Sequence, residues 1–409
     1  MLAFGSMSAV DERGRFKVAC VTGTNGKTST TSMIAAIVEA SGEPSARITT
    51  LGAFVAGETI ARDHTGEAFE ATISAAIAAG VKTLVIETTS EALANGFAAT
   101  FPPDVAVFTN FTRDHLDAHG TMEDYLAAKA QLFVHARSAV VLHASDGASA
   151  LLSEVTPPAV TRLGYAARAI DPDCAELPLT LVATSVRAAR DGTRITLAPS
   201  KLADRLGGEL HLRVVGAVHA ENALAAAVAA DALGYDAAAI NAGLSAFSGV
   251  AGRFQIVGRA PLVAIDYAHT PDALARTLAL ARALGDGRVI VVFGCGGDRD
   301  RGKRPEMGLV ASESADVVVL TTDNPRHEVA ETIADEVAAG AKEGASPFLR
   351  IADRAVAIRT AIELAAPSDI VVVAGKGHEA VQIVGDLEVP FDDAIIARTA
   401  LTELGKDSP

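Results

Sequence analysis

A glycine-rich turn between a strand-like and a helix-like stretch constrains this chain more than any other feature of its sequence. The turn reads Val21-Thr22-Gly23-Thr24-Asn25-Gly26-Lys27-Thr28-Ser29-Thr30. A β-prone apolar run, Phe16 to Val21, precedes it, and a helical pattern that ends near Ser41-Gly42 follows it. Because glycines let backbone N–H groups approach a polyphosphate, and because a helix N-terminus favours negative charge, this pattern predicts a phosphate-binding loop.

Two residues at the end of the turn have side chains that nucleotide chemistry requires. Lys27 stands where a phosphate-binding cation belongs, and Thr28 stands where a hydroxyl ligand of Mg²⁺ belongs. Val21 occupies the place of the first glycine in the common G-x-x-x-x-G-K-[ST] form, so the loop, which begins at Gly23, is shortened. The alternative, an ordinary glycine turn beside a surface lysine, does not explain the flanking strand and helix. The sequence therefore predicts binding of a nucleoside triphosphate.

Length and charge limit the class of protein. The chain has 409 residues, enough for two or three domains, and its net charge of -15 argues against nucleic acid or an anionic membrane as a partner. Hydrophobic residues make up 49% and aromatic residues 4%, which indicates an α/β protein with a core of small aliphatic side chains. The sequence shows neither a signal peptide nor an apolar run long enough to span a bilayer. Cys20, Cys174 and Cys295 are too widely separated for a disulfide framework or a zinc pattern, so we expect a cytoplasmic protein.

Strand-like and helix-like stretches alternate after the phosphate loop, as in an α/β sheet. A buried strand, Val81 to Ile86, ends in Glu87, a position that suits either a Mg²⁺ ligand or a capping residue. A second strand, Val105 to Thr109, runs into the polar loop Asn110 to Asp117. A single histidine in such a loop, here His115, is more often structural than a ligand.

One lysine lies on the apolar face of a predicted helix. Within Thr121 to His135, Lys129 stands four residues after Tyr125 and four before Phe133, which places its stem among apolar side chains. Such a lysine must extend its amine to solvent, pair with an anion, or change chemically. Periodicity alone favours extension to solvent.

The rest of the first domain predicts an antiparallel addition and an Ala-rich helix. Period-two stretches flank Asp191-Gly192, a hairpin signal. The helix, His219 to Leu233, opens with His219 and Asn222, and polar side chains at a helix start are usually caps. We therefore predict a short tail over residues 1–16 and, over residues 17–255, a P-loop-type central ATPase domain with an antiparallel addition.

Residues 256–409 alternate more regularly and predict a Rossmann-like, doubly wound, mostly parallel sheet. The predicted strands are Leu262–Ile265, Val289–Phe293, Val317–Leu320, Phe348–Ile351 and Ile370–Val373, and the predicted helices include Pro271–Leu284, Glu331–Lys342 and Arg354–Leu364. Polar clusters that begin at Asp266, Gly294, Asp323, Asp353 and Gly375 follow the strands. Open α/β sheets bind ligands at the carboxyl edge of their strands, so these clusters predict a site. Turn chemistry alone would explain their glycines but not their repeated charged side chains.

Several motifs, taken in order, carry a resemblance to a known family. They are Gly23-Thr24-Asn25-Gly26-Lys27-Thr28, Glu87, Asn110 to Asp117, Ala127-Ala128-Lys129, Asn222-Ala223-Leu224, Gly252-Arg253-Phe254 and Asp266-Tyr267-Ala268-His269-Thr270-Pro271. From Lys17 on, the chain resembles the Mur ligases, and among them the UDP-N-acetylmuramoyl-tripeptide synthetases, which add the third residue of the peptidoglycan stem peptide. The resemblance implies ATP-driven amide formation. The γ-phosphoryl group passes to a substrate carboxylate, an amine attacks the acyl phosphate, and ADP and phosphate leave.

The resemblance implies roles for the residues of the first domain. The ATP-binding loop would comprise Gly23, Thr24, Asn25, Gly26, Lys27, Thr28 and Ser29. Thr28 and Glu87 would bind Mg²⁺ with the help of His115. Lys129 corresponds to the lysine that the family carbamylates, and the carbamate would be a further, anionic Mg²⁺ ligand. Asn222 corresponds to an adenine-side contact.

In the second domain, Arg253 and Asp266 correspond to nucleotide contacts at the domain junction. His269 and His378 are both candidates for the base that deprotonates the incoming amine, and nothing in the sequence separates them. The branch that adds meso-diaminopimelate forms its amino-acid pocket from the positions of Asp323, Asn324, Arg326, Gly375 and Glu379. Arg326 suits a carboxylate and Glu379 an ammonium group. Lysine has no distal carboxylate for such an arginine, so Arg326 favours the diacid, unless it is simply a surface arginine after a proline turn.

The acceptor side departs from the family pattern. Where the family has Thr-Thr-Pro and Ser-Ser-His motifs that hold the muramoyl peptide, this chain has His64-Thr65-Gly66 and Thr89-Ser90-Glu91. After Arg326, Val329-Ala330 replaces the usual Asp-Pro. The phosphate loop begins so soon after Met1 that we expect the family's N-terminal uridine-nucleotide domain to be lacking. The expected function is therefore to join meso-diaminopimelate or a related amino acid to a carboxylate acceptor without a UDP handle.

Two other functions stay open. One is the orthodox UDP-N-acetylmuramoyl-L-alanyl-D-glutamate:meso-diaminopimelate ligase of peptidoglycan synthesis. The other is a catalytically inactive nucleotide-binding scaffold, against which the set of Lys27, Glu87, His115 and Lys129 argues. Cyanophycin-type and folylpolyglutamate-type ligases share the chemistry but fit the final strands less well. For a ligase we expect ATP and Mg²⁺ as cofactors, an amino acid and a carboxylate acceptor as substrates, and a monomer.

Overall fold

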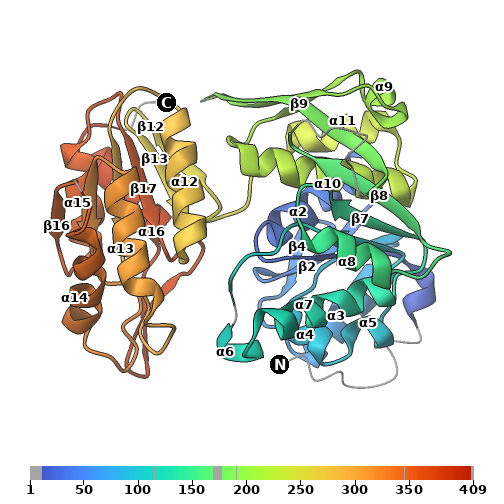
Figure 1. Cartoon of the computed structure of the whole chain (residues 1–409), viewed down its shortest axis with the longest axis horizontal. Coiled ribbons are helices and arrows are strands. Elements are labelled where there is room, and N and C mark those ends of the chain that lie inside the picture. The colour runs from blue at the N-terminus through green and yellow to red at the C-terminus, as the bar shows by residue number, and fades with distance from the viewer. Residues whose placement is uncertain (1–11, 115, 169–176, 190, 345, 407–409) are drawn as a thin grey trace. The chain divides into compact units, whose positions relative to one another are not determined.

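The computed structural model describes residues 12–114, 116–168, 177–189, 191–344 and 346–406. The chain divides into two compact units, one that ends at Ser248 and one that begins at Gly249. Within the described residues, the main sheet of the first unit has eleven strands and that of the second has six (Figure 1).

The sheet of the first unit has a parallel centre in the order β8-β7-β6-β1-β5-β2. These strands are β1 (Lys17–Thr22), β2 (Ser45–Thr49), β5 (Thr83–Glu87), β6 (Val105–Phe108), β7 (Ala139–His143) and β8 (Thr161–Ala166). β1 lies between β5 and β6 and is buried from Val18 to its end. Its unbroken apolar run is typical of a parallel strand that is covered on both faces.

Antiparallel strands extend this sheet at both edges. β9 (Leu179–Ala189), β10 (Gly192–Leu197) and β11 (Glu209–Leu212) continue it beyond β8 and confirm the predicted antiparallel addition. β3 (Gly52–Val55) and β4 (Glu58–Ala61) continue it beyond β2, which the sequence analysis did not predict.

Helices cover the sheet of the first unit. They are α2 (Lys27–Ala40), α3 (Gly66–Ala78), α4 (Ser90–Ala94), α5 (Phe97–Thr100), α6 (Leu116–His119), α7 (Met122–Val134), α8 (Ala148–Val155), α9 (Lys201–Leu206), α10 (Ala217–Leu233) and α11 (Ala237–Ala246), with a 3-10 turn, η1 (Glu12–Arg15), before β1. α11 packs closely on α2 because Gly243 has no side chain. A Cβ atom there would lie 2.5 Å from the Cα of Ile37.

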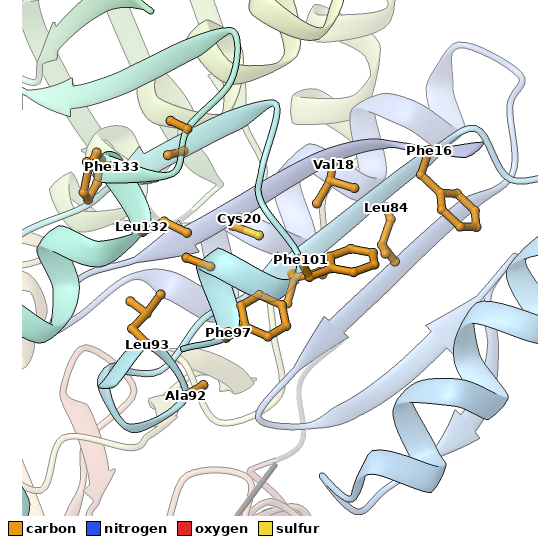
Figure 2. Close-up of a cluster of buried hydrophobic side chains, with 14 of the residues drawn as sticks. Phe16, Val18, Cys20, Leu84, Ala92, Leu93, Phe97, Phe101, Leu132 and Phe133 are labelled. Carbon is orange, nitrogen blue, oxygen red and sulfur yellow. The ribbon is translucent and has the colours of Figure 1, made fainter. Parts of the chain in front are cut away.

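The core under β1 joins strand and helix side chains (Figure 2). Val18 and Cys20 of β1 are fully buried in one cluster with aromatic side chains from α5 and the residue after it. Phe101 packs edge-on against Phe69 of α3, with 5.4 Å between the ring centres, and Phe97 lies 6.1 Å from Phe101. These ring contacts hold α3 and α5 together in the core.

The second unit confirms the predicted doubly wound sheet, in the order β12-β13-β17-β14-β15-β16. Its strands are β12 (Gln255–Arg259), β13 (Leu262–Asp266), β14 (Val289–Phe293), β15 (Val317–Leu320), β16 (Phe348–Arg350) and β17 (Ile370–Ala374), and all neighbours pair in parallel except β12 with β13. Its helices are α12 (Pro271–Ala283), α13 (Lys303–Ser314), α14 (Ala330–Ala341), α15 (Arg354–Leu364) and α16 (Asp393–Glu403). A separate hairpin consists of β18 (Val381–Val384) and β19 (Leu387–Pro390).

Two further sequence expectations concern cysteines and membranes. Cys20 and Cys295 are buried and not joined in a disulfide, whereas Cys174 lies outside the described residues. In the described part of the chain, no helix has the length and apolar character needed to cross a bilayer.

Candidate active site

The predicted phosphate loop connects β1 to α2, and its glycines are required by close contacts. Gly23 and Gly26 have positive φ angles of 145° and 86°. A Cβ atom at Gly23 would lie 1.9 Å from the hydroxyl of Thr109, and one at Gly26 would lie 2.3 Å from the side-chain oxygen of Asn222. The loop backbone is therefore packed against neighbouring polar side chains and has no room for a larger residue.

The loop after β6 holds the phosphate loop in place. The carbonyl of Asn110 accepts from the backbone N–H of Thr24 at 2.8 Å, and its side-chain oxygen accepts from the N–H of Asn25 at 2.9 Å. The Thr109 hydroxyl donates to the carbonyl of Asn25 at 2.6 Å. Thr109 and Asn110 thus hold the phosphate loop by hydrogen bonds, a role that the sequence analysis did not assign to them.

The N-terminus of α2 favours an anion. Gly26 provides no side-chain cap, and the first turn contains no acidic residue. Lys27 donates from Nζ to the carbonyls of Gly23 at 3.0 Å and Thr24 at 2.8 Å, so its cation lies on the loop itself. Thr28 and Ser29, in the first turn, are buried. Positive helix-end charge beside a lysine is the arrangement expected for binding phosphate.

Glu87 reaches back to the phosphate loop. Its Oε2 accepts from the Thr28 hydroxyl at 2.8 Å and from the backbone N–H of Thr50 at 3.1 Å, and the residue is only 8% exposed. Thr89, and not Glu87, caps α4 through its bond from the N–H of Ala92, so the capping interpretation of Glu87 is wrong. A carboxylate beside a threonine hydroxyl is a set of oxygen donors that fits Mg²⁺. His115, the third predicted ligand, lies outside the described residues.

Lys129 does not extend to solvent. It is 1% exposed, its Nζ donates to the carbonyl of Gly23 at 2.9 Å, and the Nζ lies 4.2 Å from the ring centre of Tyr125. Periodicity favoured extension, and that interpretation is wrong because Tyr125 and the phosphate loop enclose the amine. Burial, and next the positive charge of Lys27, hold the pKa of Lys129 well below its ordinary value, with Asp114 acting in the opposite direction.

Neither His219 nor Asn222 caps α10. The helix begins at Ala217 after Gly216, and both side chains are buried. The side-chain oxygen of Asn222 accepts from the Thr30 hydroxyl at 3.3 Å and faces Gly26, so Asn222 contacts the phosphate loop. Burial lowers the pKa of His219 to about 4, and within the described residues its Nδ1 has no hydrogen-bond partner.

A cavity of about 510 Å³ lies against Glu87 in the first unit. Three of the residues at which the sequence departs from the family pattern line it, namely His64, Thr89 and Glu91. The departures in the two acceptor-side motifs therefore meet in one place, whereas Val329-Ala330 lies at the start of α14 in the second unit. The cavity adjoins Glu87, the carboxylate that contacts Thr28.

In the second unit, Asp266 organises the segment that carries Arg253. Its carboxylate accepts from the N–H of Phe254 at 2.7 Å, the N–H of Ala268 at 2.9 Å and the hydroxyl of Thr277 at 3.0 Å. Burial raises the pKa of Asp266, and the nearby charge of Arg253 partly opposes this. These contacts give Asp266 a clear positioning role at the end of β13.

Tyr267 brings the two candidate bases together. Its ring centre lies 4.6 Å from that of His269 and 5.1 Å from that of His378, and the Arg253 guanidinium lies 4.3 Å from the same ring. The Nδ1 atom of His269 lies 2.9 Å from the carbonyl oxygen of Tyr267. Both histidines keep their candidacy as the base, since both border one aromatic ring.

Two of the predicted amino-acid residues, Asn324 and Glu379, meet at Lys376, a lysine that was not among the predicted site residues. Lys376 is 0% exposed and donates to the side chains of Asn324 at 2.9 Å and Glu379 at 3.2 Å. Asn324 also donates to the Glu379 carboxylate at 2.7 Å. Gly375, at φ 111°, packs on Asp323, whose pKa is raised by burial. The only sequence signal for Lys376 was its place inside the Gly375 cluster.

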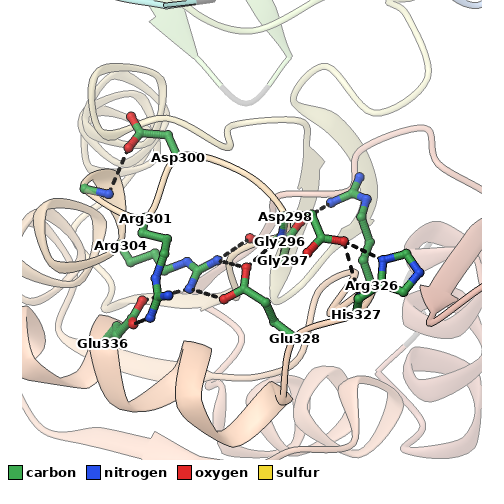
Figure 3. Close-up of polar contacts among 11 residues, drawn as sticks. Gly296, Gly297, Asp298, Asp300, Arg301, Arg304, Arg326, His327, Glu328 and Glu336 are labelled. Atoms are coloured by element: carbon green, nitrogen blue, oxygen red, sulfur yellow. Dashed lines mark hydrogen bonds and ion pairs between the residues drawn. The ribbon is translucent and has the colours of Figure 1, made fainter. Parts of the chain in front are cut away.

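Arg326 lies in a strained, braced loop. Its φ is 48°, and its guanidinium donates to the carbonyl of Gly297 at 2.8 Å. No carboxylate in the described part of the chain forms an ion pair with it. The loop is fixed by Arg304, which is fully buried and donates to Glu328 at 2.7 Å and to Glu336 at 2.7 Å (Figure 3). Arg304 lowers the pKa of Glu328 to about 2. Arg326 is thus presented on a rigid loop.

Two family models match the chain. The Mur ligase middle domain matches residues 21–230, and the Mur ligase, glutamate ligase domain matches residues 252–377. A UDP-N-acetylmuramoyl-L-alanyl-D-glutamate–2,6-diaminopimelate ligase from Synechococcus elongatus is 40% identical over 395 residues, which make up 95% of this chain and 77% of that relative. The protein of the same name from Xanthomonas campestris is 39% identical, over 93% of this chain and 76% of the relative.

Solved structures share the fold. A UDP-N-acetylmuramoyl-L-alanyl-D-glutamate–2,6-diaminopimelate ligase matches with a TM-score of 0.68 and 31% identity, over 95% of this chain and 79% of that chain. Folylpolyglutamate synthase from Mycobacterium tuberculosis has a TM-score of 0.71 at 20% identity, over 98% of this chain and 94% of its own, a likeness of fold alone. None of these comparisons supports the expectation that a uridine-nucleotide domain is lacking.

Proposed function

The chain belongs to the Mur ligase family, and we propose that it joins a diaminopimelate-class amino acid to the carboxylate of an acceptor by way of an acyl phosphate. It is an ATP-dependent, ADP-forming ligase of that family. We assign nucleotide binding to the domain of residues 17–255 and amino-acid binding to the domain of residues 256–409.

ATP would place its phosphates on the loop from Gly23 to Thr28. Lys27 would exchange its bonds to two loop carbonyls for bonds to phosphate oxygens, and the N-terminus of α2 would add its dipole. Thr28 and Glu87 would hold Mg²⁺, which when bound neutralises phosphate charge as phosphoryl transfer proceeds. Asn222 and Arg253 remain our proposed contacts to the nucleotide, and His115 a further metal ligand.

Lys129 is the residue whose surroundings best support this function. A neutral lysine amine can attack carbon dioxide, so that a C–N bond forms, one N–H proton leaves to solvent, and a carbamate anion results. The depressed pKa favours the neutral amine, and the contact with Gly23 would bring the product against the phosphate loop. The carbamate would add anionic oxygens to the donor set of Thr28 and Glu87. The buried Lys129 amine against the phosphate loop is the observation that carries the proposal.

On the amine side, the rigid loop would direct Arg326 to the distal carboxylate of the amino acid. Asp323, Asn324, Gly375 and Glu379 would shape the pocket around the other end. Either His269 or His378 would accept the proton that the attacking amine releases.

Two kinds of acceptor are candidates for the substrate that provides the carboxylate. Glu91 and His64, which line the cavity beside Glu87, favour an acceptor without a UDP handle. The relatives, which are UDP-N-acetylmuramoyl-L-alanyl-D-glutamate–2,6-diaminopimelate ligases, favour UDP-N-acetylmuramoyl-L-alanyl-D-glutamate.

The test supplies ATP, Mg²⁺, diaminopimelate and each acceptor in turn, and follows ADP and phosphate. We expect ADP release that requires both the amine and an acceptor. Nucleotide binding without turnover for every acceptor would favour an inactive scaffold, and pyrophosphate release would exclude the acyl-phosphate route.

A further inference from the structure

Three acidic residues line the cavity beside Glu87. Its charged carboxyl groups are Asp63, Glu87 and Glu91, and none of the described residues that line it is a lysine or an arginine. Glu87 is already bonded to Thr28 and Thr50, whereas Asp63 and Glu91 form no ion pair with any lysine or arginine in the described part of the chain. Among the described residues that line the cavity, His64 is the one basic side chain, and it acts on Asp63, so Asp63 and Glu91 face the cavity without a permanent cation beside them.

Local hydrogen bonds keep Asp63 ionised. Its Oδ1 accepts from the hydroxyl of Thr65 at 2.7 Å and from the backbone N–H of Thr65 at 3.2 Å, and these bonds lower the pKa of Asp63. Glu91 lies in the first turn of α4 and is exposed. A ligand with a second negative charge would meet repulsion from both groups, whereas a positive charge would pair with them.

One part of the wall is apolar. Phe69 and Phe97 line the cavity with their rings nearly perpendicular and 6.3 Å apart, and Ile48, Ala53 and Ala68 add aliphatic surface. A volume of about 510 Å³ falls within the usual range for small-molecule sites. The cavity thus suits a short, partly apolar ligand that has a cationic end.

The contact of Glu87 with Thr28 indicates which end of that ligand lies toward the phosphate loop. The carboxylate that receives phosphate must approach the phosphate loop, and Glu87 is the point where the cavity and the loop meet. We propose that the acceptor is a short peptide with a free amino terminus. Its reacting carboxylate points to the phosphate loop, its ammonium group pairs with Asp63 and Glu91, and its body packs on Phe69 and Phe97. This inference rests on the proposed ligase function.

The experiment compares three acceptors with ATP, Mg²⁺ and diaminopimelate present. These are a dipeptide amide with a free amino terminus and a glutamate side chain as its only carboxylate, its N-acetylated form, and UDP-N-acetylmuramoyl-L-alanyl-D-glutamate. Acetylation removes the ammonium charge and leaves two carboxylates without a partner, so kcat/KM should fall by about tenfold or more. In Asp63→Asn and Glu91→Gln this ratio should shrink toward one.

A matched variant is Glu67→Gln, because Glu67 is an exposed carboxylate in the first turn of α3 and does not line the cavity. Its ratio should equal that of the unmodified protein. Calorimetric titration of both dipeptides into the ADP-loaded enzyme should show the same preference, which tests binding separately from turnover. Equal or better use of the acetylated or UDP-linked acceptor would overturn this inference and leave the ligase intact. An absence of ADP release with all three acceptors would overturn both proposals.

Discussion

Among the described residues two lysines are buried, one in each unit, and their surroundings differ. Lys129, beside the phosphate loop, donates to one carbonyl, that of Gly23, and lies over the ring of Tyr125. No carboxylate in the described ranges forms an ion pair with it. Its surroundings therefore do not satisfy an ammonium group.

Lys376, in the amino-acid region, meets three oxygen acceptors. Its Nζ lies 2.9 Å from the Asn324 side-chain oxygen, 3.2 Å from the Glu379 carboxylate and 2.5 Å from the Val381 carbonyl. Since an ammonium group has three donors, all of them are used. The comparison teaches that burial alone does not identify a reactive lysine, because the acceptors around the amine decide whether it braces the fold or is free to react.

The largest expected effect is the loss of activity when Lys129 is replaced. In Lys129→Ala the proposed carbamate cannot form, and the rate of ADP release should fall by about a thousandfold. High bicarbonate or acetate, either of which can enter the vacated space as an anion, should restore part of the rate. Carbon-13 bicarbonate should give a carbamate signal in the unmodified protein that Lys129→Ala lacks. Unaffected activity would remove Lys129 from the mechanism.

The second lysine should affect stability. Lys376→Met keeps the volume but leaves Asn324 and Glu379 without their shared donor, so the free energy of unfolding should fall by about 2–3 kcal/mol. Lys129→Met should cost much less, because the thioether suits the space beside Tyr125. Urea unfolding of both variants measures the difference. If the two variants lose equal stability, the contrast between the lysines is wrong.

Removal of the Arg326 guanidinium should have a smaller effect, which concerns the choice of amino acid. Arg326→Ala should reduce the preference for diaminopimelate over lysine by about tenfold, because the distal carboxylate loses its charged partner. Competition between the two amino acids in one reaction measures the ratio. Arg276→Ala is a suitable control, since the ion pair that Arg276 forms among the described residues is with Asp272 of its own helix. An unchanged preference in Arg326→Ala would count against the assigned pocket.

Local pattern was sufficient to predict much of the fold and the phosphate loop. The apolar strands β13 to β17 and the turn before α2 have signals within a few residues, and the structure confirms them. The site depended on contacts between distant segments. Glu87 could be a cap or a ligand until Thr28 and Thr50 were found at its carboxylate.

Lys129 shows the same limit. Helical period identifies the face on which a residue lies but does not say what covers that face, and here the phosphate loop, about a hundred residues earlier, covers it. Lys376 and the cavity beside Glu87 are also products of long-range packing. Their residues had no distinctive spacing of their own.

The smallest expected effect concerns His327, an exposed residue beside the predicted amino-acid pocket, and it is a dependence of amino-acid binding on pH. His327, next to Arg326, lies with Nδ1 2.7 Å from Asp298 and Nε2 3.1 Å from Asp386, so it joins two separate segments (Figure 3 shows the first contact). Asp298, and then Asp386, raise the pKa of His327. All three groups are exposed, so the contribution to global stability is small.

Because the folded-state pKa of His327 is raised, its charged bridge is complete below about pH 6.5, the ordinary histidine value, and is lost as the pH rises through the raised value. The KM for the amino acid should therefore rise a few-fold over that window. Asp386→Asn should lower the pKa of His327, as seen by NMR titration, and move the KM transition to lower pH by the same amount. Arg276→Ala, a change on α12, should leave both the His327 titration and the KM profile unchanged. A KM profile that stays fixed while the His327 titration moves would show that the bridge does not position Arg326.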